Sequence, residues 1–350
     1  MGMPPGDWDA IVVGAGIVGC AVARQLSRRG LRTLVLDART VGAGATQASA
    51  GVLAPYIEAP GEGALQALTV RSLALYDDFI EAVERETGTS VEYRRCGTLE
   101  AAGDDSSAER LIALGEWTRS VGVAARWMEP EEVSGLEPAV GPTRGALLVP
   151  SHGYVRASQL SAALLESARL AGASFIAGRR VGGIESEDDR VTVTAGGVAY
   201  RASYLVIAAG SWSSLLASET AVTPVRGQLL QLLCERPPIT RVIWSESCYI
   251  VPWTDGTLLV GATVEDVGFD ERVTGSGVHG LLAAARALLP VTADATFVAA
   301  RVGLRPGTPS GLPVVERSST HRSVIYATGH YRNGILLAPL TGHLVSELIE

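Results

Sequence analysis

The sequence predicts an α/β fold in which a domain built on a parallel sheet is interrupted by a second, α+β domain built on an antiparallel sheet. Apolar strands alternate with a helical period over 10–36, which is typical of a parallel sheet. Successive strands separated by glycine and proline then occupy 222–263. We expect the first domain to be discontinuous, comprising 1–85, 145–220 and 300–350, and the inserted domain to comprise 86–144 and 221–299.

The first domain opens with a strand over 10–13, a glycine-rich turn and a helix over 17–28. The turn reads Gly14-Ala15-Gly16-Ile17-Val18-Gly19. Its first glycine permits a tight turn, its second lets a phosphate approach the backbone, and its third lets the helix pack on the strand. The next strand ends at Asp37, where a ribose-binding carboxylate is expected. The sequence therefore predicts a Rossmann-like dinucleotide site whose pyrophosphate faces the N-terminus of the helix.

The remaining elements follow from apolar spacing and from glycine or proline breaks. Helices are expected over 65–85, 108–121, 158–170, 278–289 and 335–349. Strands are expected over 33–36, 91–102 (as a pair), 146–149, 174–177, 191–194, 199–204, 205–210, 225–233, 242–252, 257–263, 296–302 and 324–327. The prolines and glycines of 130–142 predict a loop. The last helix is apolar over most of its surface and is expected to be buried.

Residues 42–53 are almost all small and carry no charge. Few side chains there separate the backbone from a ligand, so a flat or charged group could lie directly against the N–H donors. A flexible loop is the alternative. The apolar Val52 and Leu53 that follow favour a packed loop.

Composition narrows the class of protein. The net charge of −8 argues against a nucleic-acid or anionic-membrane surface, and paired arginines such as Arg179-Arg180 are interpreted as solvated. No apolar run reaches membrane-spanning length, and 1–5 lead into no secretory segment. The four cysteines form no metal or redox pattern, so free thiols in the cytoplasm are expected. The histidines are dispersed, and no metal site is predicted.

Three side chains in the second half of the chain suit substrate binding. Arg305 is expected in a rigid turn after a strand, and Arg332 directly precedes the last helix. A guanidinium held beside a cofactor is suited to bidentate capture of a carboxylate. A surface or salt-bridged arginine is the alternative at each position, and Tyr249 alone reads as a sheet residue. For His330, a structural hydrogen bond and a role in proton transfer both stay open.

With these residues considered, the chain resembles the glycine oxidases of the D-amino acid oxidase superfamily over nearly its whole length. The segments that carry the resemblance are 13–19, 48–55, 224–228, 303–309 and 327–339. The last two are distinctive of glycine oxidase-like sequences of the thiamine-biosynthesis type, whereas the first is shared by many flavoproteins.

The resemblance implies noncovalently bound FAD. Its pyrophosphate would lie against the glycine-rich turn, its ribose against Asp37, its adenine near Val181, and its flavin ring beside the small-residue loop and the start of the last helix. The implied cofactor-binding residues are Gly14, Ala15, Gly16, Ile17, Val18, Gly19, Asp37, Ala38, Arg39, Ala45, Thr46, Ala50, Gly51, Val52, Leu53, Val181, Ala209, Gly210, Trp212, Arg305, His330, Arg332, Asn333, Gly334, Ile335 and Leu336.

The resemblance also implies a reaction. Arg305 would pair with the carboxylate of a small amino acid, Tyr249 would donate a further hydrogen bond, and Arg332 would close that side. Hydride transfer from Cα to flavin N5 would give an imino acid, which hydrolyses to a keto acid and ammonia. Molecular oxygen would accept the electrons and give hydrogen peroxide. Glycine, sarcosine and D-alanine are the expected substrates, and no protein base is demanded.

Other interpretations stay open at this point. An FAD-dependent dehydrogenase of D-amino acids or secondary amines would pass electrons to a quinone or carrier instead. An NAD-dependent dehydrogenase would explain the opening motif but not 327–339, and a non-catalytic dinucleotide-binding protein is a further alternative. Trp253 replaces a residue that is commonly basic in the family, which bears on substrate identity. A homo-oligomer is compatible with the sequence.

Overall fold

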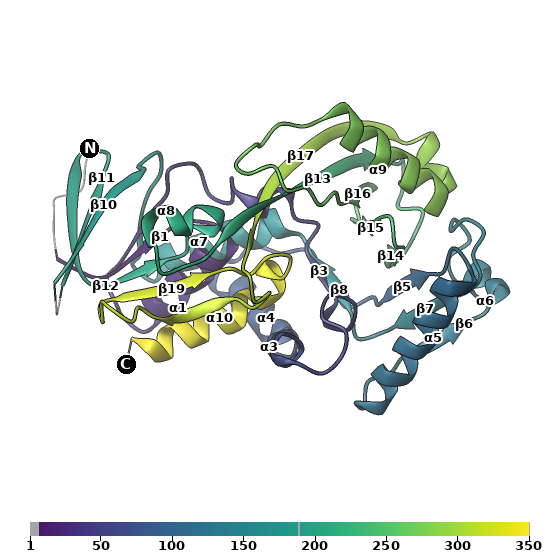
Figure 1. Ribbon diagram of the computed structural model, residues 1–350, viewed down its shortest axis with the longest axis horizontal. Helices are drawn as coiled ribbons and strands as arrows, with labels where there is room; N and C mark the ends of the chain where they lie inside the picture. The colour runs from purple at the N-terminus through teal and green to yellow at the C-terminus, as the bar shows by residue number, and fades with distance from the viewer. Residues whose placement is uncertain (1–6, 188–189, 350) are drawn as a thin grey trace.

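Two large sheets dominate the structure, a computed structural model that describes residues 7–187 and 190–349. The prediction for 1–5 lies outside the described residues. The molecule is elongated, and the two sheets occupy its two halves (Figure 1). The predicted α/β fold is confirmed. None of the described helices is long and apolar enough to cross a membrane.

The first sheet has a parallel centre. Within the described residues its strands are β1 (Trp8–Val13), β2 (Thr33–Leu36), β9 (Ser174–Ile176), β10 (Val181–Ser186), β11 (Val191–Ala195), β12 (Val198–Ile207), β18 (Val314–Arg317) and β19 (Val324–Thr328). β1 lies between β2 and β12, and all three run parallel. β9 and β19 extend this parallel core on either side, whereas β10, β11 and β18 add antiparallel edges.

Helices form two layers on this sheet. They are α1 (Ile17–Arg28), α3 (Ala64–Ala74), α4 (Tyr76–Thr87), α7 (Ala157–Leu170) and α10 (Gly334–Leu348). α1 and α10 contact the strands of the sheet, and the other three pack on helices, α7 on α1, α3 on α10 and α4 on α7. α1 packs between α7 and α10, and its buried residues join the largest apolar core. α10 is buried along most of its length, as its uniformly apolar sequence predicts. The two helices that begin at the carboxyl ends of β1 and β19, α1 and α10, are thereby packed against each other.

The second sheet is mostly antiparallel. Its strands, in spatial order, are β17 (Thr296–Gly307), β13 (Thr223–Leu233), β16 (Thr257–Gly261), β15 (Tyr249–Pro252), β14 (Val242–Trp244), β5 (Thr98–Ala101), β7 (Ala146–Val149) and β6 (Arg126–Met128). The pair β5–β14 is parallel. The helices α5 (Asp105–Ser120), α6 (Pro130–Leu136) and α9 (Gly275–Leu288) belong to this half of the molecule. β5, β6 and β7 lie at the end farthest from β10–β12 (Figure 1).

Because β7 and all of β17 belong to the second sheet, strands of that sheet extend past the boundaries proposed near 145 and 300. We retain the division into a discontinuous first domain and an inserted second domain as a proposal, with these boundaries moved to the ends of β7 and β17.

The small-residue stretch is a packed connection, as predicted. It contains the 3₁₀ turn η1 (Ala45–Ala48), the short strand β3 (Val52–Leu53) and the short helix α2 (Pro55–Glu58). β3 pairs with β8 (Gly153–Val155), which also pairs with β4 (Tyr93–Arg94). A second 3₁₀ turn, η2 (Gly210–Trp212), and the short helix α8 (Ser213–Leu216) follow β12.

Several predicted elements were wrong in their boundaries. The helix over 65–85 is two helices, α3 and α4, because the chain bends at Leu75 so that α3 can pack on α10 and α4 on α7. The predicted loop over 130–142 begins with α6, since Pro130 occupies the first helical turn, where a missing N–H costs nothing. The strands predicted as a pair over 91–102 are β4 and β5, which belong to different sheets.

Other predicted strands were divided or joined incorrectly. The strands over 199–204 and 205–210 form one strand, β12, whose first half pairs with β11 and whose second half pairs with β19. The strand over 242–252 is the hairpin β14–β15. Arg305 lies within β17 and not in a turn after it. Pro306 is accommodated there because β17 is an edge strand that pairs with β13 alone among the described strands.

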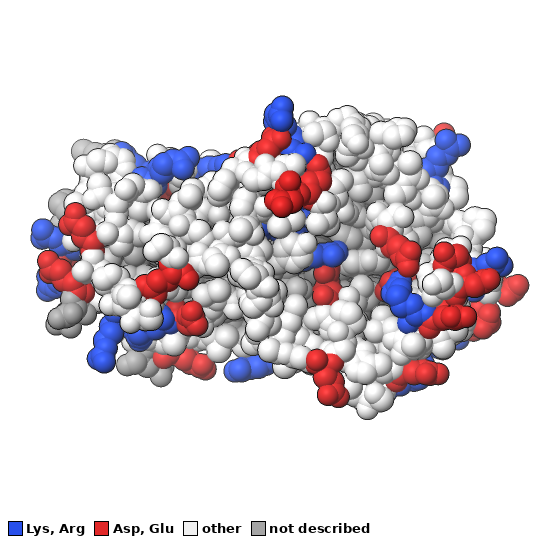
Figure 2. Space-filling view, viewed as in Figure 1, with Lys and Arg blue, Asp and Glu red and all other residues white. Residues whose placement is uncertain are grey.

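Charged side chains are intermixed over the surface. On the face shown in Figure 2, acidic and basic groups form small mixed clusters separated by uncharged residues. Charge on this face therefore does not direct a ligand to one place.

The contact between α1 and β1 makes a testable prediction. A Cβ atom at Gly19 would lie 1.9 Å from the carbonyl oxygen of Gly14, so strand and helix would have to separate. We expect Gly19→Ala to lower the free energy of unfolding by about 3 kcal/mol or more, measured by urea denaturation. Gly30→Ala is the control: Gly30 has a φ of 85° but no atom within 4 Å of its Cβ, and its loss should be about 1 kcal/mol. Equal losses would contradict the prediction.

Candidate active site

One cavity, of about 450 Å³, joins most of the residues singled out from the sequence. It begins at the glycine-rich turn and reaches the side chains of Tyr249, Arg305 and Arg332 at its opposite end. Five predicted cofactor-binding residues do not line the cavity: Ala15, Gly19, Leu53, Asn333 and Leu336. The remaining predicted residues line it: Gly14, Gly16, Ile17, Val18, Asp37, Ala38, Arg39, Ala45, Thr46, Ala50, Gly51, Val52, Val181, Ala209, Gly210, Trp212, Arg305, His330, Arg332, Gly334 and Ile335.

The N-terminus of α1 forms one wall of the cavity. Gly16 is the N-cap of α1 and has no side chain to cap the helix, and no acidic residue lies in the first turn. The amide of Ile17 donates to Thr46 Oγ1 at 3.1 Å. Gly14 adopts a φ of 108°, which other residues rarely reach. This uncapped helix end favours an anionic group in the cavity.

Asp37 is fixed at the end of β2. Its Oδ2 accepts a hydrogen bond from the Ala15 amide at 2.6 Å, and its Oδ1 accepts one from the Arg39 amide at 2.6 Å. Two backbone donors therefore hold the carboxylate against the glycine-rich turn, at the position where a ribose hydroxyl is expected.

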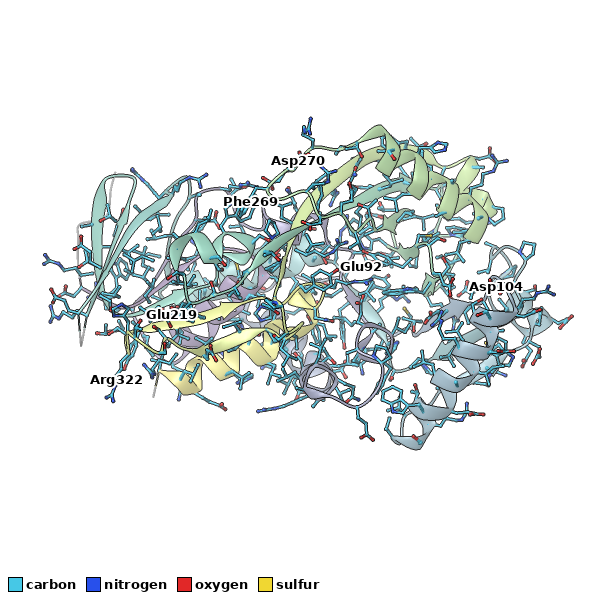
Figure 3. The ribbon with its side chains drawn as sticks, in the orientation of Figure 1. Glu92, Asp104, Glu219, Phe269, Asp270 and Arg322 are labelled. Carbon is cyan, nitrogen blue, oxygen red and sulfur yellow. The ribbon has the colours of Figure 1, made fainter. Side chains whose placement is uncertain are left out.

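Arg39 connects this region to the second half of the molecule. Its guanidinium forms a bidentate ion pair with Glu271, at 2.8 and 2.5 Å, and lies 4.7 Å from the centre of the Trp212 ring. Trp212 in turn contacts Phe269, with ring centres 5.8 Å apart. Phe269 and Asp270 lie on the connection between β16 and α9, above the junction of the two halves (Figure 3). This loop therefore contacts two residues that line the cavity, Arg39 and Trp212.

Arg305 is held by neighbouring backbone. Its Nη1 donates to the carbonyl oxygens of Thr263, at 3.0 Å, and Arg226, at 3.3 Å. Its guanidinium lies directly over Gly227, where a Cβ atom would be 2.3 Å from Nη2. Glycine at 227 thus leaves the space that this guanidinium occupies. Burial lowers the pKa of Arg305, which reflects the cost of removing its charge from water.

Tyr249 projects from β15 beside Arg305. Its ring lies over Gly261, where a Cβ atom would be 2.4 Å from the phenol oxygen. The ring centres of Tyr249 and Trp244 are 4.9 Å apart. Burial raises the pKa of Tyr249, while the charge of Arg305 lowers it. The phenol therefore keeps its proton near neutral pH and can donate a hydrogen bond.

Arg332 and Glu58 form an ion pair at the same end of the cavity. Arg332 Nε lies 3.1 Å from Glu58 Oε2. The Glu58 side chain is 10% exposed and that of Arg332 34% exposed. Burial raises the pKa of the Glu58 carboxyl, whereas the charges of Arg332 and Arg305 lower it. Glu58 was not predicted as a site residue; its one local signal is that it closely follows the small-residue stretch.

The start of α10 forms the wall between these regions. His330 is buried, its Nε2 lies 2.9 Å from Thr341 Oγ1 on α10, and burial lowers its pKa to about 4. Gly334 and Ile335 expose the uncapped helix end to the cavity. Asn333 Oδ1, directly before the helix, is buried and has no partner among the described residues. The helix end thus offers donors and positive partial charge to a polar ligand.

Sequence reasoning missed other lining residues as well. Arg179 and Arg180, interpreted as solvated surface, are exposed but lie at the edge of the cavity next to Val181. Leu215 and Leu216 of α8 also line it. A turn after β9 that carries two arginines gives no local sign that it borders the dinucleotide site.

The geometry defines a class of protein. An uncapped helix after a glycine-rich turn, an acid at the end of the second parallel strand, and paired basic groups at the far end are the parts of a dinucleotide-dependent enzyme that handles a carboxylate substrate.

Comparisons with known proteins identify the family. Residues 9–348 match the DAO family, described as FAD dependent oxidoreductase. A glycine oxidase of Geobacillus kaustophilus is 33% identical over 98% of this chain and 93% of its own length. A bifunctional protein ThiO/ThiG of a Nostoc species is 34% identical over 97% of this chain, which spans 52% of that protein. The crystal structure of the glycine oxidase from Geobacillus kaustophilus has a TM-score of 0.95 at 33% identity and covers 98% of this chain and 94% of that chain.

The chain therefore belongs to the DAO family of FAD-dependent oxidoreductases. The predicted resemblance to the glycine oxidases and the prediction of an FAD-dependent enzyme are confirmed. The cavity fits this cofactor because the uncapped end of α1 and the fixed carboxylate of Asp37 supply the two polar anchors of an adenine dinucleotide.

The buried histidine predicts a pH dependence. Unfolded His330 would titrate near its ordinary pKa of 6.5, whereas the folded group titrates near 4. Between these values the unfolded chain binds more protons, so stability falls as the pH decreases from 6.5 to about 4. We expect His330→Asn to reduce the slope of unfolding free energy against pH by about 1 kcal/mol per pH unit between pH 6 and 5, measured by urea denaturation.

The control for this prediction is His279→Asn, on the exposed surface of α9. His152 stays present in all variants; burial also lowers its pKa, to about 3, so part of the slope remains. An unchanged slope in His330→Asn would show that His330 takes up a proton in the folded state.

Proposed function

We propose that this protein is an oxidase of glycine and other small amino acids, including sarcosine and D-alanine. The observation that carries the proposal is the group of Arg305, Tyr249 and Arg332 at one end of the FAD cavity. The similarity to glycine oxidases over nearly the whole chain supports it.

Each group has a proposed role in holding the substrate. Arg305 pairs with the substrate carboxylate, because its hydrogen bonds to carbonyl oxygens orient the guanidinium while leaving its charge uncompensated by those neutral partners. Tyr249 donates a further hydrogen bond to the same carboxylate. Arg332, paired with Glu58, closes that side. The substrate is thereby held with its Cα–H bond toward the cofactor, and orientation supplies much of the rate.

The proposed reaction is an oxidative deamination. Bound FAD supplies the acceptor for the hydride that leaves Cα. The amine of the substrate has to be neutral so that its lone pair can assist the departure of the hydride. The resulting imino acid then hydrolyses to a keto acid and ammonia. In sum, an amino acid, oxygen and water give a keto acid, hydrogen peroxide and ammonia, or methylamine in place of ammonia when sarcosine is the substrate. Buried, neutral His330 is engaged with Thr341, in agreement with a reaction that needs no histidine base.

We also propose a cytoplasmic location and a part in supplying a precursor for thiamine. All four cysteines, Cys20, Cys96, Cys234 and Cys248, are free, as predicted, which supports a reducing compartment. The similarity to a ThiO/ThiG protein supports the second proposal.

The test of the function is a visible spectrum of the FAD-bound protein before and after anaerobic addition of glycine, sarcosine or D-alanine. We expect the flavin absorbance to bleach with at least one of them and peroxide to form when air is admitted. Failure of all three to bleach the flavin would overturn the proposed substrate class. Bleaching without peroxide would replace molecular oxygen by another acceptor, as in a dehydrogenase.

A variant tests the carboxylate contact. Arg305→Ala removes a charged hydrogen-bond donor, so we expect the dissociation constant of the substrate to rise by about 10- to 150-fold, which corresponds to roughly 1.5–3 kcal/mol. Stopped-flow reduction under anaerobic conditions measures this constant. Arg301→Ala is the matched control, since Arg301 lies on the same strand but does not line the cavity. Equal effects in the two variants would show that Arg305 does not bind substrate.

A further inference from the structure

We propose that Glu58 determines substrate specificity: by neutralising Arg332 it restricts the site to amines that carry one carboxylate and excludes those that carry two. This inference rests on the proposed function, because it concerns the same substrate end of the cavity. It assigns a role to a residue that neither the motifs nor the family resemblance singled out.

The first observation is the placement of Glu58. It is the last residue of α2, immediately after the packed small-residue connection, and its side chain lines the cavity. Its exposed fraction is 10%, and its one ion-pair partner among the described residues is Arg332. A carboxylate with so little exposure keeps its charge in a folded protein where a cation compensates it.

The second observation is the balance of charge. Arg305 donates to the carbonyl oxygens of Arg226 and Thr263, and no carboxylate forms an ion pair with it within the described ranges. The charges of Arg332 and Glu58 both act on Arg305, so all three groups lie within electrostatic range. Two guanidinium groups and one carboxylate leave one net positive charge. That charge matches one substrate carboxylate.

A second carboxylate on the substrate would compete with Glu58 for Arg332. Binding it would either separate Glu58 from its cation or place two carboxylates beside one guanidinium. Separation leaves a largely buried carboxylate without a partner, which is strongly unfavourable. The pair therefore acts against dicarboxylate amines, while a monocarboxylate needs only Arg305. This is selection by an unfavourable charge, not by pocket size.

The experiment uses two matched substrates. Sarcosine and iminodiacetate differ only in that a carboxylate replaces one hydrogen of the N-methyl group. We expect Glu58→Gln, compared with the unmodified FAD-bound enzyme, to raise the ratio of kcat/KM for iminodiacetate over sarcosine by about 10-fold or more, the effect of one freed charged hydrogen bond. The double variant Glu58→Gln with Arg332→Gln should lose this gain, because no guanidinium besides Arg305 remains for the second carboxylate.

Binding supplies a readout that does not depend on turnover. Methoxyacetate and diglycolate are unreactive ether analogues of the two substrates, and their binding can be followed by the change in absorbance of the bound FAD. We expect Glu58→Gln to bind diglycolate about 10-fold more tightly while its dissociation constant for methoxyacetate changes by less than about 3-fold.

The control is Glu137→Gln, which neutralises another carboxylate of low exposure that is paired with an arginine, Arg241, and does not line the cavity. It should leave both ratios unchanged. If Glu58→Gln does not retain FAD, Glu58→Ser tests the same loss of charge in a smaller side chain. Unchanged ratios in the FAD-bound Glu58 variant would overturn the inference. Failure of the unmodified enzyme to oxidise any of glycine, sarcosine and D-alanine would overturn the proposed function instead, and the binding comparison would still decide the role of Glu58.

Discussion

The structure depends on one close backbone approach, where the glycine-rich turn crosses the end of the parallel sheet. A Cβ atom at Gly14 would lie 2.4 Å from the carbonyl oxygen of Ala208, and one at Gly19 would lie 1.9 Å from that of Gly14. β1, β12 and the start of α1 are thereby brought together with no side chain between them. The N-terminus of α1 consequently forms one wall of the cavity, and Asp37, at the end of the neighbouring strand, can accept a hydrogen bond from the Ala15 amide. Cofactor binding and the centre of the fold share this contact.

Local patterns predicted this region well because its signals lie within a few residues of one another. The bounds of α1 and β2 and the position of Asp37 follow from glycine spacing and apolar runs. The failures share a different cause. β12 changes its pairing partner along its length, and Pro306 is accommodated in β17 only because that strand lies at an edge. Glu58 meets Arg332 through tertiary structure alone. The pairing partner of a strand and the charge that faces a side chain come from distant parts of the chain, so a local sequence pattern does not predict them.

The substrate end of the cavity is made by both halves of the molecule. Arg305 and Tyr249 come from strands of the second sheet, whereas Glu58 and Arg332 come from segments that border the first. Gly227 leaves room for the guanidinium of Arg305, and Gly261 leaves room for the ring of Tyr249. The position of the charged groups relative to the cofactor therefore depends on how the second sheet is docked, in addition to the rotamers of the side chains themselves.

The Arg39–Glu271 ion pair contributes to the docking of the two halves. Arg39 follows the ribose-binding strand, and Glu271 lies on a loop of the other half that also brings Phe269 against Trp212. Arg39 and Trp212 both line the cavity, so these two contacts tie one of its walls to the loop of the other half. The shape of that wall and the connection between the two halves are therefore set by the same contacts. Because Arg39 and Glu271 are partly exposed, dissolved salt weakens their attraction, and the strength of this connection becomes a property of the solution as well as of the chain.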